Sequence, residues 1–395
     1  MVLPAKNKVA HGGKLCQHLP SVLNTVHDGS VLIFGFLFPS LKLRLSNAIM
    51  QALILAGGKG TRLRPLTVYT PKPVVPILNR PLLAYQLELL AQAGITDITL
   101  SLSYQPDKIE DVLGDGSDFD VKLRYLTEPS PMGTAGAYKF AAGAIRETTV
   151  VFNGDILTDV DIASVVKTHA SNKAEATIVL APVEDPSKFG LVETGPKSEV
   201  VRFLEKPSPE LLAETKLNTI NAGIYVLEPS VLDLVPENEN CSFEYDVFPA
   251  LIREGRRFFS HILTDEYWRD LGTPASYLAA HHDLLSGRVS GFERGEKAPS
   301  EIATAADVDR ISILGKGCVV KPNAKIVNSV LGPGVHVDEK ALIKDSVIWA
   351  HTRISASAEI DGAVIGRSCY IGRNTSIRAG AVLGDKTSLP DYSRT

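Results

Sequence analysis

The sequence predicts an α/β domain with a mainly parallel sheet, followed by a parallel β-helix. Three observations predict this organisation: strand-like and helical patterns alternate from Met50 to about Gly287, a glycine-rich turn follows the first strand, and a seventeen-residue repeat fills the C-terminal part. A chain of 395 residues with 44% hydrophobic composition is long enough to form two or three domains.

Residues 1–49 differ in kind from the rest of the chain. Their apolar run, Val31 to Pro39, is shorter than the roughly 20 residues that a membrane helix needs and lacks the flanks of a signal peptide. We expect a poorly ordered extension or an upstream misread start, with a membrane anchor as the less favoured alternative.

The segment 50–287 alternates strands and helices. We expect strands at Ala52–Ala56, Ile98–Ser103, Lys122–Leu126, Val150–Asn153 and Ala176–Ala181. We expect helices at Leu82–Ala93, Thr134–Ala144, Ile162–Ala170 and Ser276–Ser286. Such alternation is typical of a parallel sheet covered on both faces, with ligands at the carboxyl ends of its strands.

The C-terminal part repeats in frames of seventeen residues, which start at residues 313, 330, 347 and 364. The second, eighth and fourteenth residue of each frame is aliphatic, as in Leu314, Val320 and Ile326. With this spacing, the aliphatic side chains of every coil point into one common interior, which predicts a β-helix of about four coils. We assign residues 288–309 to a linker, 310–384 to the β-helix and 385–395 to a tail.

The net charge of −4 gives no basic surface for nucleic acid. The four cysteines, at positions 16, 241, 318 and 369, lack the spacing of a zinc site. We expect a reduced, cytoplasmic chain without disulfides, partnered neither with nucleic acid nor with a membrane.

The turn after the first strand carries an anion-binding pattern. Gly57, Gly58 and Gly60 leave backbone N–H groups open to phosphates, and Arg62 and Lys72 follow within reach. A triphosphate fits this pattern, whereas the alternative is a tight turn with solvated cations.

The stretch from Leu53 to Pro73 resembles the signature of the nucleoside-diphosphate-sugar pyrophosphorylases, and its Thr-Pro-Lys-Pro segment looks most like the mannose-1-phosphate guanylyltransferase branch. The resemblance implies a Rossmann-like nucleotidyltransferase domain and a short left-handed parallel β-helix of hexapeptide type. It also implies transfer of a nucleotidyl group from an NTP, closest to GTP, onto a sugar 1-phosphate, closest to mannose 1-phosphate.

The same resemblance assigns roles to individual residues. The implied catalytic residues are Arg62, Lys72, Asp155 and Asp270, of which the two aspartates would hold Mg²⁺. The implied nucleotide-binding residues are Leu55, Ala56, Gly57, Gly58, Gly60, Thr61, Arg62, Glu128, Gly133 and Thr134. The implied sugar-phosphate-binding residues are Gly190, Glu205, Lys206 and Asn221. Each aspartate alone could instead cap a turn.

Base choice depends on Glu128. Thymidylyl and uridylyl relatives tend to carry Gln at the position that Glu128 matches, and a carboxylate can only accept hydrogen bonds. Guanine presents two adjacent donor groups, so Glu128 favours guanine, while a solvent-exposed Glu remains the alternative.

Other functions stay open at this point. Another NDP-sugar synthesis (thymidylyl-, uridylyl- or adenylyl transfer to glucose 1-phosphate) and a non-catalytic sugar-nucleotide sensor are the main alternatives. His336 or His351 could serve acyl transfer in the β-helix, but four coils are few for such a site. We expect the β-helix to support a homo-oligomer or regulation.

Overall fold

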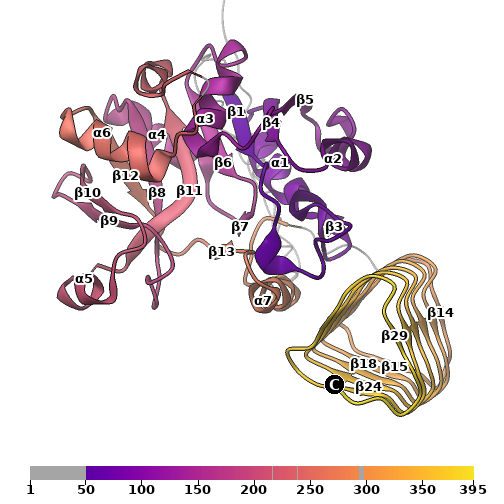
Figure 1. Cartoon of the computed structure of the whole chain (residues 1–395). Helices are drawn as coiled ribbons and strands as arrows, with labels where there is room; N and C mark the ends of the chain where they lie inside the picture. The colour runs from indigo at the N-terminus through magenta and orange to yellow at the C-terminus, as the bar shows by residue number, and fades with distance from the viewer. Residues whose placement is uncertain (1–49, 216, 238, 293–297) are drawn as a thin grey trace, which may run out of the picture. The chain divides into compact units, whose positions relative to one another are not determined.

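The computed structural model describes residues 50–395, except 216, 238 and 293–297. The predicted extension 1–49 lies outside the described residues. The α/β part runs from β1 to α7, and a parallel β-helix follows it (Figure 1).

The central sheet has nine strands within the described residues, and seven of them follow the order β10-β9-β11-β6-β1-β4-β5. Its strands are β1 (Gln51–Leu55), β4 (Asp97–Leu102), β5 (Lys122–Thr127), β6 (Thr149–Asn153), β8 (Ala176–Pro182), β9 (Leu191–Thr194), β10 (Val200–Leu204), β11 (Thr219–Leu227) and β12 (Phe258–Ile262). The four strands β6, β1, β4 and β5 are parallel, as predicted. Beyond them β11 runs antiparallel to β6, which the sequence did not predict.

Helices cover both faces of this sheet. They are α1 (Leu82–Gln92), α2 (Pro106–Leu113), α3 (Gly133–Phe140), α4 (Ile162–Ser171), α5 (Pro209–Glu214), α6 (Phe248–Arg253) and α7 (Pro274–Ser286). Because side chains alternate along a strand, Ile54 packs with α1, α2 and α4 on one face, whereas Leu53 packs with α3 and α6 on the other. Burial on both faces explains the uninterrupted apolar sequence of β1.

Two small strand pairs complete the α/β part. Strands β2 (Pro76–Ile77) and β3 (Arg80–Pro81) form a hairpin before α1. Strand β13 (Trp268–Asp270) pairs antiparallel with β7 (Ile156–Thr158), so that Asp270 lies opposite Ile156. This pairing brings a segment from the end of the domain next to Asp155.

The β-helix consists of three parallel sheets with the orders β14-β17-β20-β23-β26-β29, β15-β18-β21-β24-β27 and β16-β19-β22-β25-β28. Its strands are β14 (Glu301–Ile302), β15 (Asp307–Val308), β16 (Ile313–Leu314), β17 (Val319–Val320), β18 (Lys325–Val327), β19 (Val330–Leu331), β20 (His336–Val337), β21 (Leu342–Lys344), β22 (Val347–Ile348), β23 (Arg353–Ile354), β24 (Glu359–Asp361), β25 (Val364–Ile365), β26 (Tyr370–Ile371), β27 (Ser376–Ile377), β28 (Val382–Leu383) and β29 (Ser388–Leu389).

The stack is longer at both ends than the predicted boundaries of 310 and 384. Ile302 and Val308 lie in the expected linker, yet they continue the six-residue spacing and form strands. Leu389, in the expected tail, keeps the same six-residue spacing from Leu383 and belongs to the last strand. The seventeen-residue frame missed this strand because the coil from Ile365 to Leu383 holds one extra residue.

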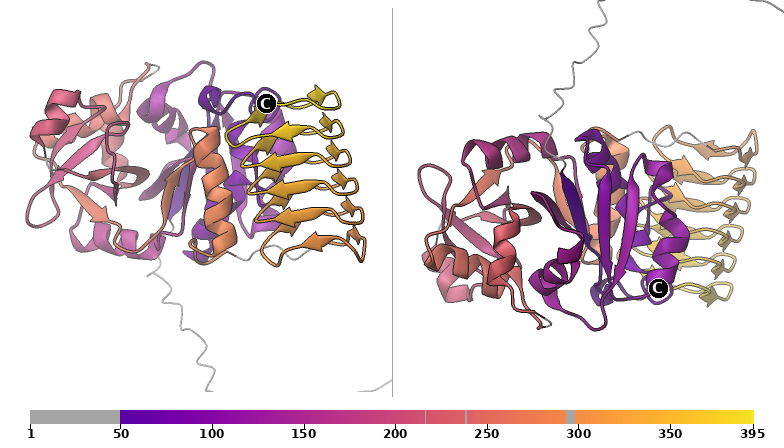
Figure 2. Two further views of the ribbon diagram at one scale, coloured as in Figure 1. Left: turned by 90° about the horizontal axis from the view of Figure 1, so that it is seen from below. Right: turned by 90° about the horizontal axis from the view of Figure 1, so that it is seen from above.

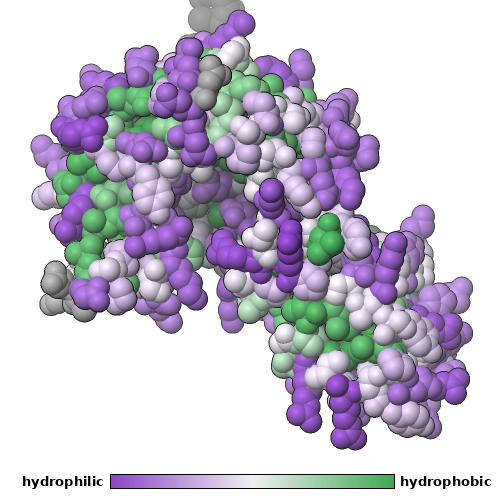
Figure 3. Space-filling view, viewed as in Figure 1, coloured by the Kyte–Doolittle hydropathy of each residue, from purple (hydrophilic) through white to green (hydrophobic). Residues whose placement is uncertain are grey.

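The β-helix packs against α7 and the segment after β1. Trp349 is buried, its Nε1 donates to Tyr277 Oη at 3.0 Å, and it shares an apolar cluster with Leu63. Figure 2 shows α7 beside the stacked coils. Figure 3 shows a mostly hydrophilic face, with apolar residues visible inside the end of the β-helix. None of the described helices is both long and apolar enough to cross a bilayer.

Candidate active site

Two cavities lie at the carboxyl ends of the parallel strands, where α/β sheets commonly bind ligands. The first has a volume of about 350 Å³ and the second about 440 Å³. Asn153 and Asp155 line both cavities and form a shared wall between them. Two ligands bound side by side would therefore meet at the end of β6.

The first cavity collects most of the predicted nucleotide-binding residues. Its lining includes Leu55, Ala56, Gly57, Gly58, Lys72, Glu128, Gly133, Thr134 and Asp155. A Cβ atom on Gly57 would lie 2.9 Å from Ser103 Oγ and 3.1 Å from Glu128 Oε1. The position therefore needs glycine, because any side chain would push into the wall of the cavity.

Gly60, Thr61 and Arg62 differ from the expectation, because none of them lines the first cavity. Gly60 has φ 59°, and its carbonyl accepts a hydrogen bond from Thr67 Oγ1 at 2.7 Å. It precedes a 3-10 helix, Thr61–Leu63, that carries Arg62 to the lining of the second cavity. Gly60 thus sets the backbone conformation of the turn that places Arg62 at the second cavity.

The two predicted metal aspartates converge on one lysine. Lys72 Nζ lies 2.7 Å from Asp155 Oδ2 and 4.0 Å from Asp270 Oδ1. Both oxygens approach the same ammonium group, so side-chain rotation alone could bring them to the ~2.1 Å ligand distance of one Mg²⁺ ion. Lys72 is almost fully buried, whereas the carboxylates face the cavities.

The electrostatics of Asp270 fit a cation site. Burial and the neighbouring charge of Asp155 raise the pKa of Asp270, while Lys72 and Arg62 oppose this shift. A Cβ atom on Gly272 would lie 2.5 Å from Asp270 Oδ2 and 3.0 Å from Arg62 Cζ. Gly272 therefore permits the close approach of this arginine and aspartate.

A divalent metal would find two carboxylates here. The described residues hold no group of three or more histidine, cysteine or acidic side chains that could bind a metal. Mg²⁺ commonly takes only one or two protein carboxylates and fills its other positions with phosphate oxygens and water. Asp155 and Asp270 therefore suit Mg²⁺ bound together with a nucleotide.

The second cavity contains all four predicted sugar-phosphate residues, namely Gly190, Glu205, Lys206 and Asn221. A Cβ atom on Gly190 would lie 2.6 Å from Glu205 Oε2, so this position also needs glycine. Lys206 Nζ lies 3.6 Å from Glu205 Oε1. Burial, and then the charge of Glu244, raise the pKa of Glu205.

Glu128 is buried in the wall of the first cavity instead of facing solvent. Its Oε1 accepts from Ser101 Oγ at 2.9 Å, and its Oε2 accepts from the backbone N–H of Met132 at 3.2 Å. Each oxygen retains a further lone pair for a ligand. The solvent-exposed alternative for Glu128 is therefore wrong.

Comparison with known proteins identifies the α/β part. The sequence profile of the nucleotidyl transferase family, described as "Nucleotidyl transferase", matches residues 51–287. The chain belongs to the nucleotidyl transferase family. A second profile, described as "EIF2B subunit epsilon LbH domain", matches residues 296–393, in agreement with a left-handed β-helix.

Relatives of this nucleotidyltransferase carry informative names. Mannose-1-phosphate guanylyltransferase of Mycobacterium tuberculosis is 39% identical over 279 residues, which cover 70% of this chain and 76% of that protein. Mannose-1-phosphate guanyltransferase of Schizosaccharomyces pombe is 39% identical over 276 residues, which cover 68% of this chain and 74% of that protein. A putative glucose-1-phosphate thymidylyltransferase from Bacillus anthracis, solved in complex with a sucrose, aligns with a TM-score of 0.55 at 26% identity, covering 62% of this chain and 98% of that one.

The sequence analysis of this nucleotidyltransferase missed several residues that line the cavities. Asn153 forms half of the shared wall, and its buried Oδ1 has no hydrogen-bond partner among the described residues. Trp268 and Glu244 line the second cavity, and Trp268 Nε1 donates to the carbonyl of Ala222 at 2.8 Å. Asn153 precedes the Gly-Asp pair directly, a position that could have signalled its role.

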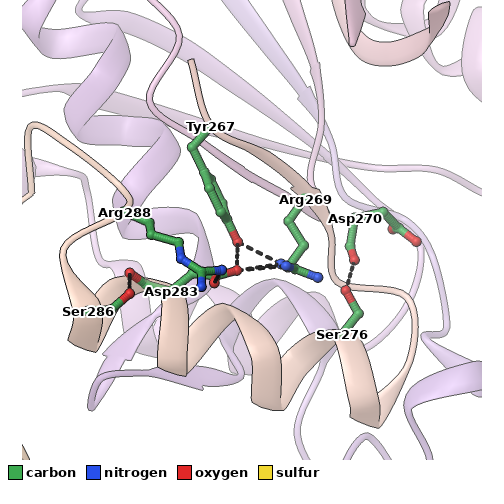
Figure 4. Close-up of polar contacts among 7 residues, drawn as sticks. All are labelled: Tyr267, Arg269, Asp270, Ser276, Asp283, Ser286 and Arg288. Atoms are coloured by element: carbon green, nitrogen blue, oxygen red, sulfur yellow. Dashed lines mark hydrogen bonds and ion pairs between the residues drawn. The ribbon is translucent and has the colours of Figure 1, made fainter. Parts of the chain in front are cut away.

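A polar cluster holds β13 in place behind the site (Figure 4). Asp283 on α7 accepts from Tyr267 Oη at 2.8 Å and from Arg269 Nη2 at 2.7 Å. Ser276 Oγ donates to the backbone carbonyl of Asp270. The strand that carries Asp270 is thus fixed on α7 by half-buried hydrogen bonds, of which the one from Arg269 to Asp283 is charge-assisted.

Proposed function

We propose that this nucleotidyltransferase joins GTP and mannose 1-phosphate to give GDP-mannose and pyrophosphate. The observation that carries the proposal is the shared wall, where Asp155 faces both cavities and Asp270 lies across Lys72 from it. A nucleotide in the first cavity and a sugar phosphate in the second would bring an α-phosphate and an attacking oxygen together at this wall.

The reaction is an in-line displacement at the α-phosphorus. A phosphate oxygen of the sugar 1-phosphate attacks, the bond to the β-phosphate breaks, and pyrophosphate leaves with the electron pair. Lys72 would neutralise negative charge beside the shared wall, and Arg62, which lines the second cavity, would contact the phosphates where the two substrates meet. Mg²⁺ held by Asp155 and Asp270 would supply further neutralisation of the phosphates.

The substrates follow from Glu128 and from the named relatives. Glu128 would accept hydrogen bonds from the adjacent N1–H and N2–H₂ groups of guanine, whereas thymine and uracil offer one donor and two carbonyl groups. The choice of mannose rests on the relatives named mannose-1-phosphate guanylyltransferase. Glu205, Lys206 and Asn221 would hold the sugar phosphate.

The proposal extends to the context of the enzyme. We place catalysis in residues 50–287, the site of action in the cytoplasm, and self-association of copies in the β-helix, whose parallel sheets offer flat faces.

The test is pyrophosphate release by the purified chain with Mg²⁺, measured for each of the four NTPs and for dTTP against a panel of sugar 1-phosphates. We expect GTP with mannose 1-phosphate to give the highest kcat/KM. A preference for dTTP or UTP would move the assignment to another NDP-sugar, and no release with any pair would overturn it.

A further inference from the structure

Glu244 lines the second cavity and has no role in the reaction described above. It belongs to a π-helical turn, Phe243–Val247, which Ser242 caps. The hydroxyl of Ser242 accepts hydrogen bonds from the backbone N–H of Glu244 at 3.1 Å and of Tyr245 at 3.3 Å. This cap fixes the backbone of Glu244, whose side chain lines the cavity.

One carboxylate oxygen of Glu244 is hydrogen-bonded to a residue that lines the first cavity. Its Oε2 accepts from Thr134 Oγ1 at 2.8 Å and from Ser242 Oγ at 2.6 Å. Thr134 lines the first cavity, and its Oγ1 also accepts from the backbone N–H of Phe243 at 2.9 Å. The Glu244 side chain is therefore hydrogen-bonded to a residue of the first cavity while it faces the second.

The backbone reinforces this link. The carbonyl of Cys241 accepts from the N–H groups of Ala135 and Gly136, both at 3.0 Å. A Cβ atom on Gly133 would lie 2.4 Å from the same carbonyl oxygen. The turn that contains Gly133 and Thr134 is thus packed directly on the segment that leads to Glu244, so neither can shift alone.

The other carboxylate oxygen of Glu244 keeps capacity for a ligand. Among the described residues, its Oε1 accepts one long hydrogen bond, 3.4 Å, from Tyr225 Oη, which in turn accepts from Asn221 Nδ2 at 2.9 Å. Glu205 faces the same cavity, and burial together with the charge of Glu244 raises the pKa of Glu205. Two carboxylates in one cavity require hydrogen-bond donors, and a sugar offers several hydroxyl groups.

We propose that Glu244 couples the two substrate sites: its Oε1 accepts a hydroxyl of the sugar phosphate, while its Oε2 holds Thr134 and the turn that binds the base. The inference rests on the proposed function. Binding at one site orders a side chain that the other site uses, so each substrate improves the binding of the other by the same factor.

The test compares Glu244→Gln with Glu239→Gln, which makes the same chemical change at an exposed side chain a few residues earlier. KM for mannose 1-phosphate is measured at low and at saturating GTP. In the wild type and in Glu239→Gln, we expect saturating GTP to lower this KM. In Glu244→Gln, we expect KM to rise roughly tenfold or more and its dependence on GTP to disappear.

A second variant approaches the link from the other side. Thr134→Val keeps the shape of the side chain but removes the hydroxyl bonded to Glu244. We expect it to raise KM for mannose 1-phosphate although Thr134 does not line the sugar cavity, and we expect no further loss of coupling when it is combined with Glu244→Gln. Coupling that persists in both single variants would overturn the inference while leaving the proposed function standing. A wild type that transfers no nucleotidyl group would overturn both.

Discussion

The two cavities are built by different means. The first is shaped by backbone and small residues, with Gly57 and Gly133 at positions where a Cβ atom would clash. The second is lined by charged side chains such as Glu205, Lys206 and Glu244. The difference indicates that the first site combines a close backbone fit with one carboxylate, Glu128, that can accept from a base, whereas the second holds its ligand mainly through several charged side chains.

Asp155 lines both cavities and Asp270 lies across Lys72 from it, so variants of these two aspartates should have the largest effect. Asp155→Asn or Asp270→Asn should lower kcat by about a thousandfold, because loss of charge at a metal-assisted phosphoryl transfer costs several kcal/mol of transition-state stabilisation. Steady-state kinetics at saturating Mg²⁺ measure this loss. Asp265→Asn, on the exposed loop before β13, is the matched control and should keep wild-type kcat. Near-normal turnover in both Asp155→Asn and Asp270→Asn would remove the site assignment.

Base selection in the first cavity should depend on Glu128. Glu128→Gln keeps the shape and an acceptor for the N–H of Met132, but it loses one charged acceptor, so kcat/KM for GTP should fall by roughly one to two decades. The activity with UTP or dTTP should rise relative to GTP. A competition assay with mixed nucleotides measures the change, and an unaltered preference would exclude Glu128 from base recognition.

Close fit in the first cavity can be tested at Gly57. Gly57→Ala places a methyl group against Ser103 and Glu128, and overpacking of this kind costs about 1–3 kcal/mol, so KM for GTP should rise roughly tenfold. Gly143→Ala is the control, because a Cβ atom there meets nothing within 4 Å. If KM for mannose 1-phosphate rises instead, the division between the cavities is wrong.

The charged groups in the second cavity should make kcat/KM for the sugar phosphate change a few-fold with pH. Burial and the charge of Glu244 raise the pKa of Glu205 above its ordinary 4.5, against the opposing charge of Lys206; Lys188 also faces the cavity. The ionised form accepts hydrogen bonds from the sugar, so kcat/KM for the sugar phosphate should fall as the pH drops through this raised pKa.

The raised pKa of Glu205 also makes the stability of the folded state depend on pH. The folded state holds the proton of Glu205 more tightly than the unfolded chain, so this group favours folding below its unfolded pKa and loses that contribution as the pH rises through the folded pKa. In the pH profile of kcat/KM for the sugar phosphate, Glu205→Gln should abolish the decline at low pH (the acid limb), and Glu244→Gln should move this decline to lower pH. An acid limb that survives in Glu205→Gln would assign it to another group.

The sequence predicted features that repeat or that are local in the chain. The buried strand around Ile54, the glycine turn after it and the six-residue rhythm of the β-helix depend on neighbouring residues, and the structure contains all of them. The C-terminal end of the β-helix was misplaced because the extra residue before Leu383 breaks the frame.

Contacts between distant segments could not be predicted in the same way. Glu244 reaches Thr134 only because α3 packs on the turn after Cys241, more than a hundred residues away in the chain. The docking of Trp349 on Tyr277 likewise joins two domains whose sequence patterns are independent. The roles of Asp155 and Asp270 came from family resemblance, and those roles stay predictions.

The central claim is that a guanylyl group passes from GTP to a sugar phosphate at the shared wall. The most direct measurement follows radioactive phosphorus in GTP labelled either at the α- or at the γ-position, with mannose 1-phosphate and Mg²⁺. We predict that the α-label appears in GDP-mannose and the γ-label in pyrophosphate, and that Asp270→Asn abolishes both transfers. Release of the γ-label as inorganic phosphate, or recovery of the α-label only in unreacted GTP, would contradict the account.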